Sequence, residues 1–584
     1  MLFPRLRLVT CKGTLSVITR QNSLWTAGNV VKSPAKDILV PDVPLHEYVW
    51  KNLDKWPTKT AIVCGVTDRS YTYEQVYYHS RNFAAHLRKS FNIQDGDCIA
   101  VMLPNLPEYP AVLFGIMAAG GLATTINPGY TAHEVQRQLT LSEAKLVITT
   151  PEIAPVMKEA LKIIQKDLPM ITVTGSKINE AASFEELMNS KDVDKDVLKE
   201  VRRVAGDVCL LPCSSGTTGL PKGVELTHRN IVANCEQQNT ELRHYEFTTG
   251  SHQDSVVIVL PMFHMFALSV AMVHKFSAGL RLVSLPSFQP RSFLDAMVQY
   301  RVSLMYTAPP LALFLGSHPA VSSEHFAHLN TIVCGAAPLP GADVDNVLRK
   351  AGKELDFLQG YGLTETSPLA TVSPPGSRDR ASAGVPIPSV ELRVVDAELR
   401  NLGPNEVGHL DRKLGSLDLG DMHNGSTRES QVQEGELLIR GPNIMKGYKD
   451  NPEANEEAFA EAGWLRSGDL ARVSDAGALY ICDRLKELIK VKGFQVPPAE
   501  LEAALKEHPG VLDAAVVGAP DDEAGERPKA FVISQGNTTA KDILGFVNER
   551  LAKYKRIKDL VFVDSIPKNP SGKILRRVIK EKYC

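Results

Sequence analysis

Short apolar runs that alternate with helical stretches constrain the fold of this chain more than any other feature. Runs of four to six residues lie at 98–103, 122–126, 145–149, 255–260, 281–285, 303–307 and 331–334. Apolar runs of this length that are bounded by turn residues are typical of buried strands. Because strands that alternate with helices pair in parallel, the sequence predicts an α/β fold with ligands at the carboxyl ends of the strands.

The chain is predicted to have more than one domain. Its 584 residues are too many for one compact core, and the pattern of the sequence changes near residue 484. We predict a large N-terminal region of parallel-rich sheets with packed helices over residues 37–483, followed by a small α+β unit over residues 484–584. The polar segment 409–432 is predicted to be a long surface loop, and the sequence does not reveal its role.

The composition is that of an ordinary globular protein. The formal net charge is -2, which gives no reason to expect nucleic acid as a partner. The nine cysteines include no CxxC pair, which favours reduced thiols in an intracellular compartment. The apolar stretch 109–125 is shorter than the roughly 20 residues that a membrane span requires. We therefore predict a buried helix that runs into a strand there, and no transmembrane segment.

Residues 1–36 differ from the rest of the chain. They contain basic and hydroxyl residues, and the first acidic residue is Asp37. The basic residues are Arg5, Arg7, Lys12, Arg20, Lys32 and Lys36. This composition is typical of a mitochondrial transit peptide, and a non-targeting extension of a cytoplasmic protein is the alternative. The chain ends in Lys-Tyr-Cys, which is not a Ser-Lys-Leu peroxisomal signal.

The strongest chemical signal is the segment 214–223, SSGTTGLPKG. Its glycines let the backbone approach an anion, its hydroxyls donate hydrogen bonds, and its lysine supplies positive charge. The residues with these properties are Ser214, Ser215, Gly216, Thr217, Thr218, Gly219 and Lys222. The segment is predicted to bind phosphate, but it lacks the Gly-Lys-Ser/Thr ending of a Walker A loop.

This loop resembles the signature of the adenylate-forming superfamily, which includes acyl-CoA synthetases, coumarate-CoA ligases and luciferases. Four further segments resemble family motifs and occur in the family's order: YGLTET at 361–366, WLRSGDL at 464–470, DRLKELIK at 483–490 and PKNPSGK at 567–573. The resemblance covers roughly residues 40–580. It implies an adenylate-forming domain for ATP and the acyl substrate over 37–483 and a mobile lid domain over 484–584.

The resemblance implies an ATP-dependent acid–thiol ligase. A carboxylate is a poor electrophile, and its mixed anhydride with AMP supplies a leaving group. The expected substrates are a fatty or aryl-propenoic carboxylic acid, ATP and coenzyme A, with Mg²⁺ as the metal. A luciferase-like adenylating oxygenase, transfer to a carrier protein and a pseudoenzyme remain alternatives, and the oligomeric state stays open.

The resemblance also assigns catalytic roles. Lys573 would bridge the carboxylate substrate and the α-phosphate. Thr364 would contact the α-phosphate, and Glu365 would be the Mg²⁺ ligand. His264 would line the pocket for the carboxylate. Phe266, Ala308, Gly360 and Met305 are expected in the acyl pocket.

The remaining implied roles concern the nucleotide and coenzyme A. Asp469 would accept hydrogen bonds from both ribose hydroxyls, and Arg484 would also reach the ribose. The adenine ring would lie along Gly335, Ala336 and Ala337. Lys486 would be the hinge between the domains, and Gly493 would line the tunnel for coenzyme A. The residues Gly360, Tyr361, Gly362 and Lys490 lie in the same motifs and are also expected to bind cofactors.

Overall fold

A computed structural model describes residues 24–584 of the chain, apart from a set of gaps. The gaps are 176–177, 179, 215–220, 397, 404–433, 462, 492–493, 522–523, 537, 550, 552, 570–571 and 584. Most of the predicted targeting segment and the predicted loop at 409–432 therefore lie outside the described residues.

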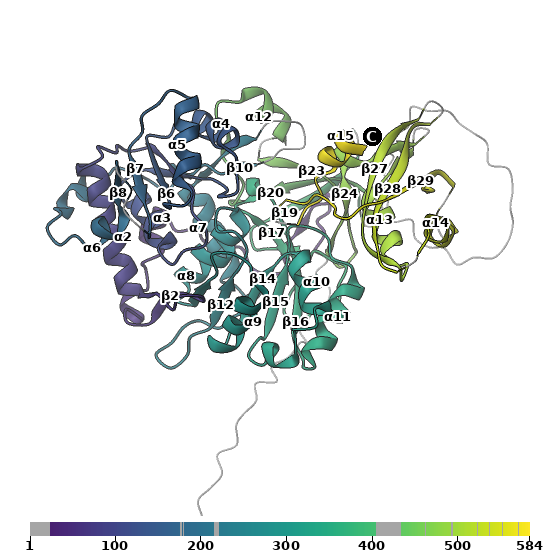
Figure 1. The fold of residues 1–584 in the computed structure, drawn as a ribbon, viewed down its shortest axis with the longest axis horizontal. Helices are drawn as coiled ribbons and strands as arrows, with labels where there is room; N and C mark the ends of the chain where they lie inside the picture. Colours follow the sequence, from purple (N-terminus) through teal and green to yellow (C-terminus); the bar gives the residue numbers. More distant parts are fainter. Residues whose placement is uncertain are drawn as a thin grey trace, which may run out of the picture.

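The strands of the described residues form four sheets (Figure 1). The first sheet has the order β10-β11-β9-β5-β4-β6-β7-β8, and β21 pairs with β11. Its strands are β4 (Cys98–Val101), β5 (Leu122–Thr125), β6 (Leu146–Thr149), β7 (Met170–Thr172), β8 (Ala181–Ser183), β9 (Val208–Leu210), β10 (Cys213–Ser214), β11 (Lys222–Thr227) and β21 (Gly447–Tyr448). The strands from β9 to β8 in this order pair in parallel, whereas β10, β11 and β21 join antiparallel.

The second sheet has the order β18-β17-β16-β15-β14-β12-β13-β2-β3 and is parallel from β16 to β2. Its strands are β2 (Thr60–Cys64), β3 (Ser70–Thr72), β12 (Ser255–Ile258), β13 (Arg281–Ser284), β14 (Leu304–Thr307), β15 (Thr331–Cys334), β16 (Asp356–Gly362), β17 (Leu369–Val372) and β18 (Val385–Pro386). The apolar runs predicted to be strands lie in these two sheets, so the expected α/β architecture is confirmed.

The third sheet is antiparallel throughout, which the sequence pattern did not predict. Its strands are β1 (Val31–Lys32), β19 (Glu391–Val395), β20 (Gly435–Arg440), β22 (Phe459–Glu461), β23 (Trp464–Val473) and β24 (Leu479–Arg484). β1 belongs to the range predicted as a targeting segment. Val31 is nevertheless buried, and Lys32 forms an ion pair with Glu391 at 3.0 Å. The end of the 1–36 segment is thus part of the fold.

The fourth sheet forms the C-terminal unit and has its own apolar core. Its strands are β25 (Ile489–Val491), β26 (Phe494–Val496), β27 (Val511–Asp521), β28 (Gly525–Ser534) and β29 (Asp559–Phe562). Three helices accompany this sheet, α13 (Pro498–Lys506), α14 (Ala540–Asn548) and α15 (Arg576–Tyr583). The mixture of antiparallel hairpins and helices agrees with the predicted α+β unit.

Helices cover the sheets, and several begin at sequence signals. Thr72, Thr131 and Thr227 each form a capping box at the start of a helix. The remaining helices are α1 (Leu45–Tyr48), α2 (Tyr73–Lys89), α3 (Tyr109–Ala118), α4 (Ala132–Ser142), α5 (Ala154–Ile163), α6 (Phe184–Asn189), α7 (His228–Gln238), α8 (Lys275–Ser277), α9 (Pro290–Gln299), α10 (Pro309–Ser317), α11 (Gly341–Ala351) and α12 (Pro452–Ala458). The π-helix η3 spans Phe266–His274, and the short 3-10 helices include η5 (Thr364–Thr366) and η6 (Leu485–Glu487).

The predicted buried helix at 109–125 is present as α3 followed by β5. Every residue of α3 is buried. Within the described part of the chain, no helix has the length and apolar character needed to cross a membrane.

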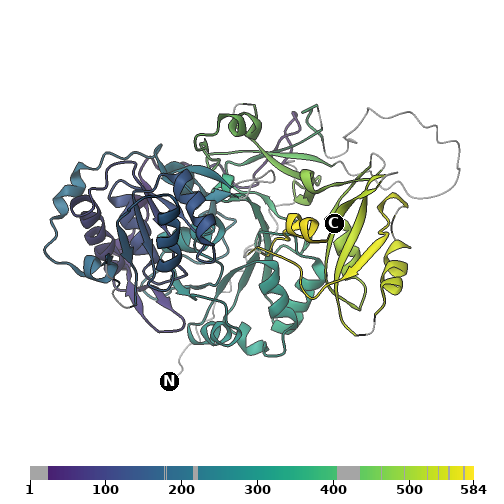
Figure 2. The same ribbon diagram turned by 45° about the horizontal axis from the view of Figure 1, so that its top comes forward.

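The C-terminal unit lies at one end of the molecule in both views, beside α10, α11 and the third sheet (Figures 1 and 2). The third sheet leads into it through β24 and η6. Residues far apart in the sequence therefore meet where the second sheet, the third sheet and the C-terminal unit come together.

Candidate active site

A cavity of about 920 Å³ lies at this meeting point. Its lining comes from the carboxyl ends of β14, β15 and β16, from strands of the first and third sheets and from the C-terminal segment 568–575. The predicted site residues that line it are Ser214, Lys222, His264, Gly335, Ala336, Gly360, Tyr361, Gly362, Thr364, Glu365, Arg484 and Lys573. The motifs identified separately along the chain thus share one cavity.

The predicted phosphate loop is described only at its two ends. Ser214 and Lys222 face each other across the β10–β11 pair, and both line the cavity. Ser215, Gly216, Thr217, Thr218 and Gly219 lie outside the described residues. The Lys222 Nζ atom lies 4.9 Å from the centre of the Tyr448 ring, a distance at which a cation is attracted to an aromatic face.

Glu365 lies in η5, directly after β16, and is held at both its backbone and its side chain. Its backbone carbonyl accepts a hydrogen bond from the Met445 backbone N–H at 2.8 Å. Its Oε1 atom accepts one from the Tyr448 hydroxyl at 2.9 Å. Gly362, which precedes this turn, has no room for a side chain, since a Cβ atom would lie 1.8 Å from the Pro368 carbonyl oxygen.

Oxygen ligands at this position fit a magnesium ion that is bound mainly through phosphates. The described residues contain no cluster of three or more His, Cys, Asp or Glu side chains that could hold a metal ion alone. Glu365 nevertheless supplies a carboxylate on the cavity wall near the predicted phosphate loop. Mg²⁺ is commonly held by one or two carboxylates together with substrate phosphates, so this donor set fits it.

Asp469 lies just behind the cavity wall and is 2% exposed. Its Oδ2 atom accepts a hydrogen bond from the Tyr361 hydroxyl at 2.6 Å, and its Oδ1 atom lies 3.1 Å from Nε of Arg484. Burial raises the pKa of the Asp469 carboxyl, and the nearby Arg484 opposes that shift. The three side chains form a fixed polar corner made by β16, β23 and β24.

The segment 335–337 forms another part of the wall. Gly335 and Ala336 line the cavity, whereas Ala337 does not. A side chain at Gly335 would come within 3.3 Å of the Gly360 carbonyl oxygen and 3.4 Å of the Phe266 ring. The small residues therefore leave space in the cavity at the carboxyl ends of β15 and β16.

Lys573 enters the cavity from the C-terminal unit. Its backbone N–H donates to Asn569 Oδ1 at 2.8 Å, which closes the turn that carries it. The preceding Gly572 has a φ of +84°, and a Cβ atom there would lie 2.5 Å from Pro310 Cδ. A glycine is therefore needed to bring this turn against α10.

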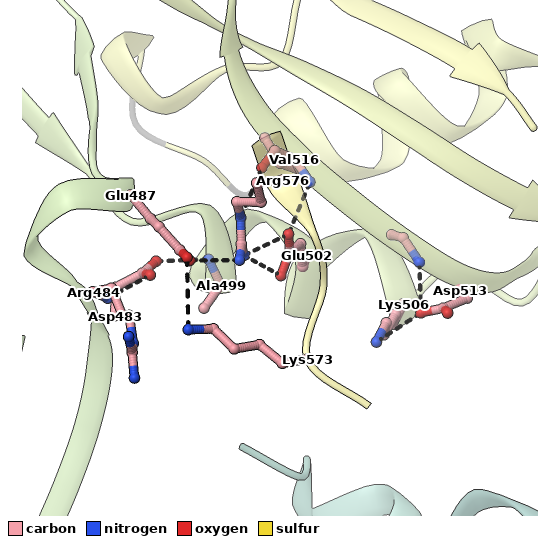
Figure 3. A network of polar contacts seen from close by, with 11 residues as sticks. Asp483, Arg484, Glu487, Ala499, Glu502, Lys506, Asp513, Val516, Lys573 and Arg576 are labelled. Atoms are coloured by element: carbon pink, nitrogen blue, oxygen red, sulfur yellow. Dashed lines mark hydrogen bonds and ion pairs between the residues drawn. The ribbon is translucent and has the colours of Figure 1, made fainter. Parts of the chain in front are cut away.

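A partly buried ion-pair network lies beside the Lys573 side chain (Figure 3). The Lys573 Nζ atom lies 4.0 Å from Oε1 of Glu487, and Oε2 of Glu487 lies 2.6 Å from the Arg576 guanidinium. Arg576 also binds Glu502 at 2.8 Å. Burial and the nearby Arg484 lower the pKa of Lys573 to about 8, against the opposing effect of Glu487. The Lys573 amine therefore changes its protonation state near pH 8.

His264 lies on the cavity wall just before η3. Its Nδ1 atom accepts a hydrogen bond from the Phe266 backbone N–H at 3.4 Å. Burial lowers the pKa of His264, so the imidazole is neutral near pH 7.

Some predicted residues are not in the cavity. Lys490 is exposed on β25 and does not line it. The Lys486 side chain and all of Gly493 lie outside what the structure describes. Phe266 and Gly360 line the cavity as expected for the acyl pocket, but Ala308 and Met305 do not. Met305 packs into a separate apolar cluster, because neighbouring residues of β14 point to opposite faces.

Sequence reasoning missed several residues that the structure brings to this site. Tyr448 contacts both Lys222 and Glu365, and its only sequence signal is the Gly-Tyr pair at 447–448. Glu487 lies within the 483–490 motif and pairs with Lys573, and Arg576, three positions after the 567–573 motif, pairs with Glu487. Tyr306 is the residue of β14 that lines the cavity, whereas Met305 was expected to do so.

Comparisons with known proteins agree with the arrangement of the cavity. Residues 49–411 match the AMP-binding enzyme family, and residues 500–573 match the AMP-binding enzyme C-terminal domain. A relative in Petroselinum crispum, 4-coumarate–CoA ligase 1, is 36% identical over 95% of this chain and 97% of its own length. Probable 4-coumarate–CoA ligase 3 from Dictyostelium discoideum is 34% identical over 93% and 96%.

Solved structures with the same arrangement include bound nucleotides. ATP-bound MatB from Rhodopseudomonas palustris is 26% identical, with a TM-score of 0.78 over 93% of this chain and 99% of that one. The o-succinylbenzoate-CoA synthetase MenE from Bacillus subtilis, in complex with the acyl-adenylate OSB-AMP, is 25% identical with a TM-score of 0.74. The latter alignment covers 92% of this chain and 98% of that one.

Proposed function

This chain belongs to the AMP-binding enzyme family and is an ATP-dependent acid–thiol ligase, and we propose that its substrates are aryl-propenoic acids. The ligase uses ATP, Mg²⁺ and coenzyme A. The observation that carries the proposal is the cavity into which Lys573 reaches from the C-terminal unit, opposite Glu365 and the ends of the phosphate loop. The names of the curated 4-coumarate–CoA ligases favour an aryl-propenoic acid over a fatty acid.

The first half-reaction joins the acid to AMP. A carboxylate oxygen forms a bond to the α-phosphorus of ATP, and the bond to the leaving pyrophosphate breaks. Such a transfer depends mainly on positioning and on positive charge that balances the growing negative charge. The second half-reaction forms a thioester when the sulfur of coenzyme A attacks the acyl carbon and AMP leaves.

We assign the two ends of the nucleotide to different parts of the cavity. Ser214 and Lys222 belong to the phosphate end, with Thr364 beside the α-phosphate. The polar corner of Asp469, Tyr361 and Arg484 would hold the ribose, because a buried carboxylate accepts hydrogen bonds from paired hydroxyls. The small residues Gly335, Ala336 and Gly360 would face the adenine ring.

Lys573 has the position and the chemistry to act on the reacting atoms. Its side chain lines the cavity, and the Glu487–Arg576–Glu502 network behind it limits its movement. In its protonated form it would bridge the substrate carboxylate and the α-phosphate. Magnesium, held by Glu365 and the phosphates, would supply further positive charge.

We propose that the C-terminal unit acts as a lid over residues 484–584 and reorients between the two half-reactions. Lys486 lies in η6, between the third sheet and the C-terminal sheet, which suits a hinge. Gly493 would then face the path of coenzyme A. The predicted boundary at 483/484 falls at the end of β24.

The test is a measurement of pyrophosphate release by the full chain with ATP and Mg²⁺. A panel of aryl-propenoic and fatty acids is compared, with and without coenzyme A. We expect release that requires an acid, rises with coenzyme A and is fastest with an aryl-propenoic acid. A faster rate with fatty acids would overturn the proposed substrate class. Light emission or oxygen consumption in place of acyl-CoA would favour the oxygenase alternative.

We also propose that residues 1–36 direct the protein to mitochondria. The support is the absence of acidic residues before Asp37 and the presence of six basic ones. Because Trp25 and Val31 pack in the fold, a cleavage that preserves β1 would fall before Leu24. A fluorescent protein fused to residues 1–36 should enter mitochondria, and the same fusion with Arg5→Glu and Arg7→Glu should not. A cytoplasmic location for the unchanged fusion would contradict this proposal.

A further inference from the structure

The part of the cavity beside β14 contains polar groups that the adenylation chemistry does not use. Tyr306 and His244 both line the cavity. The Tyr306 hydroxyl and the His244 Nδ1 atom have no hydrogen-bond partner within the described part of the chain. Buried polar groups are normally paired, so these two atoms are available to a polar atom of a bound ligand.

This part of the cavity is distant from the phosphate end. Tyr306 pairs in register with Val333 on β15, and its ring packs edge-on against Phe266. β14 is two strands from β16, which carries Tyr361 and leads to Glu365. At the usual spacing of strands this separation is roughly 10 Å. The groups beside β14 are therefore placed to meet the end of the acid that is remote from its reacting carboxylate.

A buried lysine stands directly behind these groups. Lys275 is 1% exposed, and its Nζ atom lies 2.6 Å from Nδ1 of His274. The same nitrogen lies 5.1 Å from the centre of the Tyr306 ring and 4.5 Å from that of Tyr245. Among the ion pairs that the described residues form, none involves Lys275. Burial lowers its pKa well below the ordinary value.

The charged form of Lys275 is unfavourable at this position, because burial opposes it. A buried amine without an acidic partner must either stay neutral or remain charged at a high cost in free energy. Burial and the nearby Lys275 lower the pKa of His274, whose Nε2 atom lies 2.9 Å from Asn239 Oδ1 and 3.1 Å from the Tyr245 hydroxyl. Burial lowers the pKa of His244 to about 3, so that imidazole is neutral, and a hydrogen bond with the Leu242 backbone opposes this shift.

We infer that this end of the cavity binds a hydrogen-bond-accepting oxygen, a carbonyl or a second carboxylate, at the far end of the acid that the enzyme activates. The inference rests on the proposed function, because it concerns the acyl substrate of the same cavity. The Tyr306 hydroxyl would donate a hydrogen bond to this oxygen. Lys275 behind it has no carboxylate partner among the described residues, and a carboxylate oxygen here would favour its charged form. A methyl-terminated acid would leave the Tyr306 hydroxyl unpaired.

The test compares acids that differ only at the far end. One pair is para-acetylcinnamate and para-isopropylcinnamate, and a second is a medium-chain keto acid and its methylene counterpart. A third pair is para-carboxycinnamate and para-methylcinnamate. We expect kcat/KM for acyl-CoA formation to favour the oxygen-bearing member by about tenfold or more, mainly through KM. The first and third pairs compare a carbonyl with a carboxylate. The first and second pairs compare an aromatic acid with an aliphatic one.

Two variants assign the preference to the named groups. Tyr306→Phe removes only the hydroxyl and should reduce the preference by about tenfold. Lys275→Met removes the basic group at similar length and should reduce the preference most for the carboxylate pair. Its melting temperature should be unchanged or higher, because an unpaired buried amine is replaced by an apolar chain. A purely structural role for Lys275 predicts the opposite, a lower melting temperature with the preference intact.

Tyr109→Phe is the matched control. The Tyr109 hydroxyl is also buried and without a partner in the described part of the chain, but Tyr109 is not among the residues that line the cavity. This variant should keep the preference of the unchanged protein. Equal rates for both members of every pair, or a preference that survives Tyr306→Phe, would overturn the inference while the ligase activity stands. Absence of acyl-CoA from every acid would instead contradict the proposed function.

Discussion

Replacement of Lys573 by alanine should slow acyl-AMP formation by about a thousandfold. The amine is one of the positive groups that the C-terminal unit brings into the cavity, and alanine removes its charge from the phosphates there. Transfer of the acyl group from supplied acyl-AMP to coenzyme A should continue, since the adenylation charge is no longer required. Pyrophosphate release measures the first half-reaction, and acyl-CoA formation from synthetic acyl-AMP measures the second.

Lys580→Ala is the control for this variant. Lys580 lies on α15, seven positions further along the same unit, and pairs with Glu526 at 3.5 Å outside the cavity. It should adenylate at the rate of the unchanged protein. Equal loss of both half-reactions in Lys573→Ala would indicate a general folding defect and would contradict a role confined to adenylation.

The pH profile of the adenylation step should reveal the same group. The Lys573 amine is charged below its pKa, which burial lowers to about 8, and neutral above it. If the charged form is required, kcat/KM for adenylation without coenzyme A has its full value at lower pH and decreases as pH rises through about 8. Lys573→Arg keeps its charge at higher pH, so its remaining activity should lack this alkaline decline. A profile that stays level through pH 9 in the unchanged protein would contradict the assignment.

The general architecture and most of the cavity could be predicted because their signals are local. Short apolar runs such as 281–285 and 331–334 became strands of the second sheet, since buried strands need continuous apolar residues. The segment 335–337 follows such a strand directly, and the motif 361–366 begins at the end of β16. Residues at the carboxyl ends of neighbouring parallel strands must meet at one edge of the sheet. The shared position of Gly335 and Gly360 follows from that geometry.

Other features depend on contacts that no short segment reveals. β1 has two residues and gains its place only by pairing with β19, more than 350 positions away, so residues 24–36 were not expected in the fold. Tyr448 reaches Glu365 because β21 pairs with β11, which a Gly-Tyr pair does not indicate. Met305 and Tyr306 are both buried, and only the orientation of β14 decides which of them faces the cavity.

Replacement of Asp469 by alanine should raise the KM for ATP by about a hundredfold. The carboxylate is fixed by Tyr361 and Arg484, so its oxygens are already oriented before the nucleotide binds. Alanine removes both acceptors and leaves the Arg484 guanidinium without its partner. Direct ATP binding by calorimetry, beside the kinetic measurement, separates lost affinity from slower chemistry.

An ATP analogue without ribose hydroxyls provides the sharper comparison. If Asp469 binds the ribose, removal of these hydroxyls should weaken binding to the unchanged protein by about tenfold or more and should have little further effect on Asp469→Ala. Asp379→Ala is the matched control, because Asp379 also accepts a tyrosine hydroxyl, from Tyr480 at 2.5 Å, but is exposed and outside the cavity. That variant should discriminate between ATP and the analogue as the unchanged protein does. The losses of ATP affinity from Asp469→Ala and from the analogue could instead be fully additive. The carboxylate would then act only on Arg484 and Tyr361, and the ribose would have to lie elsewhere in the cavity.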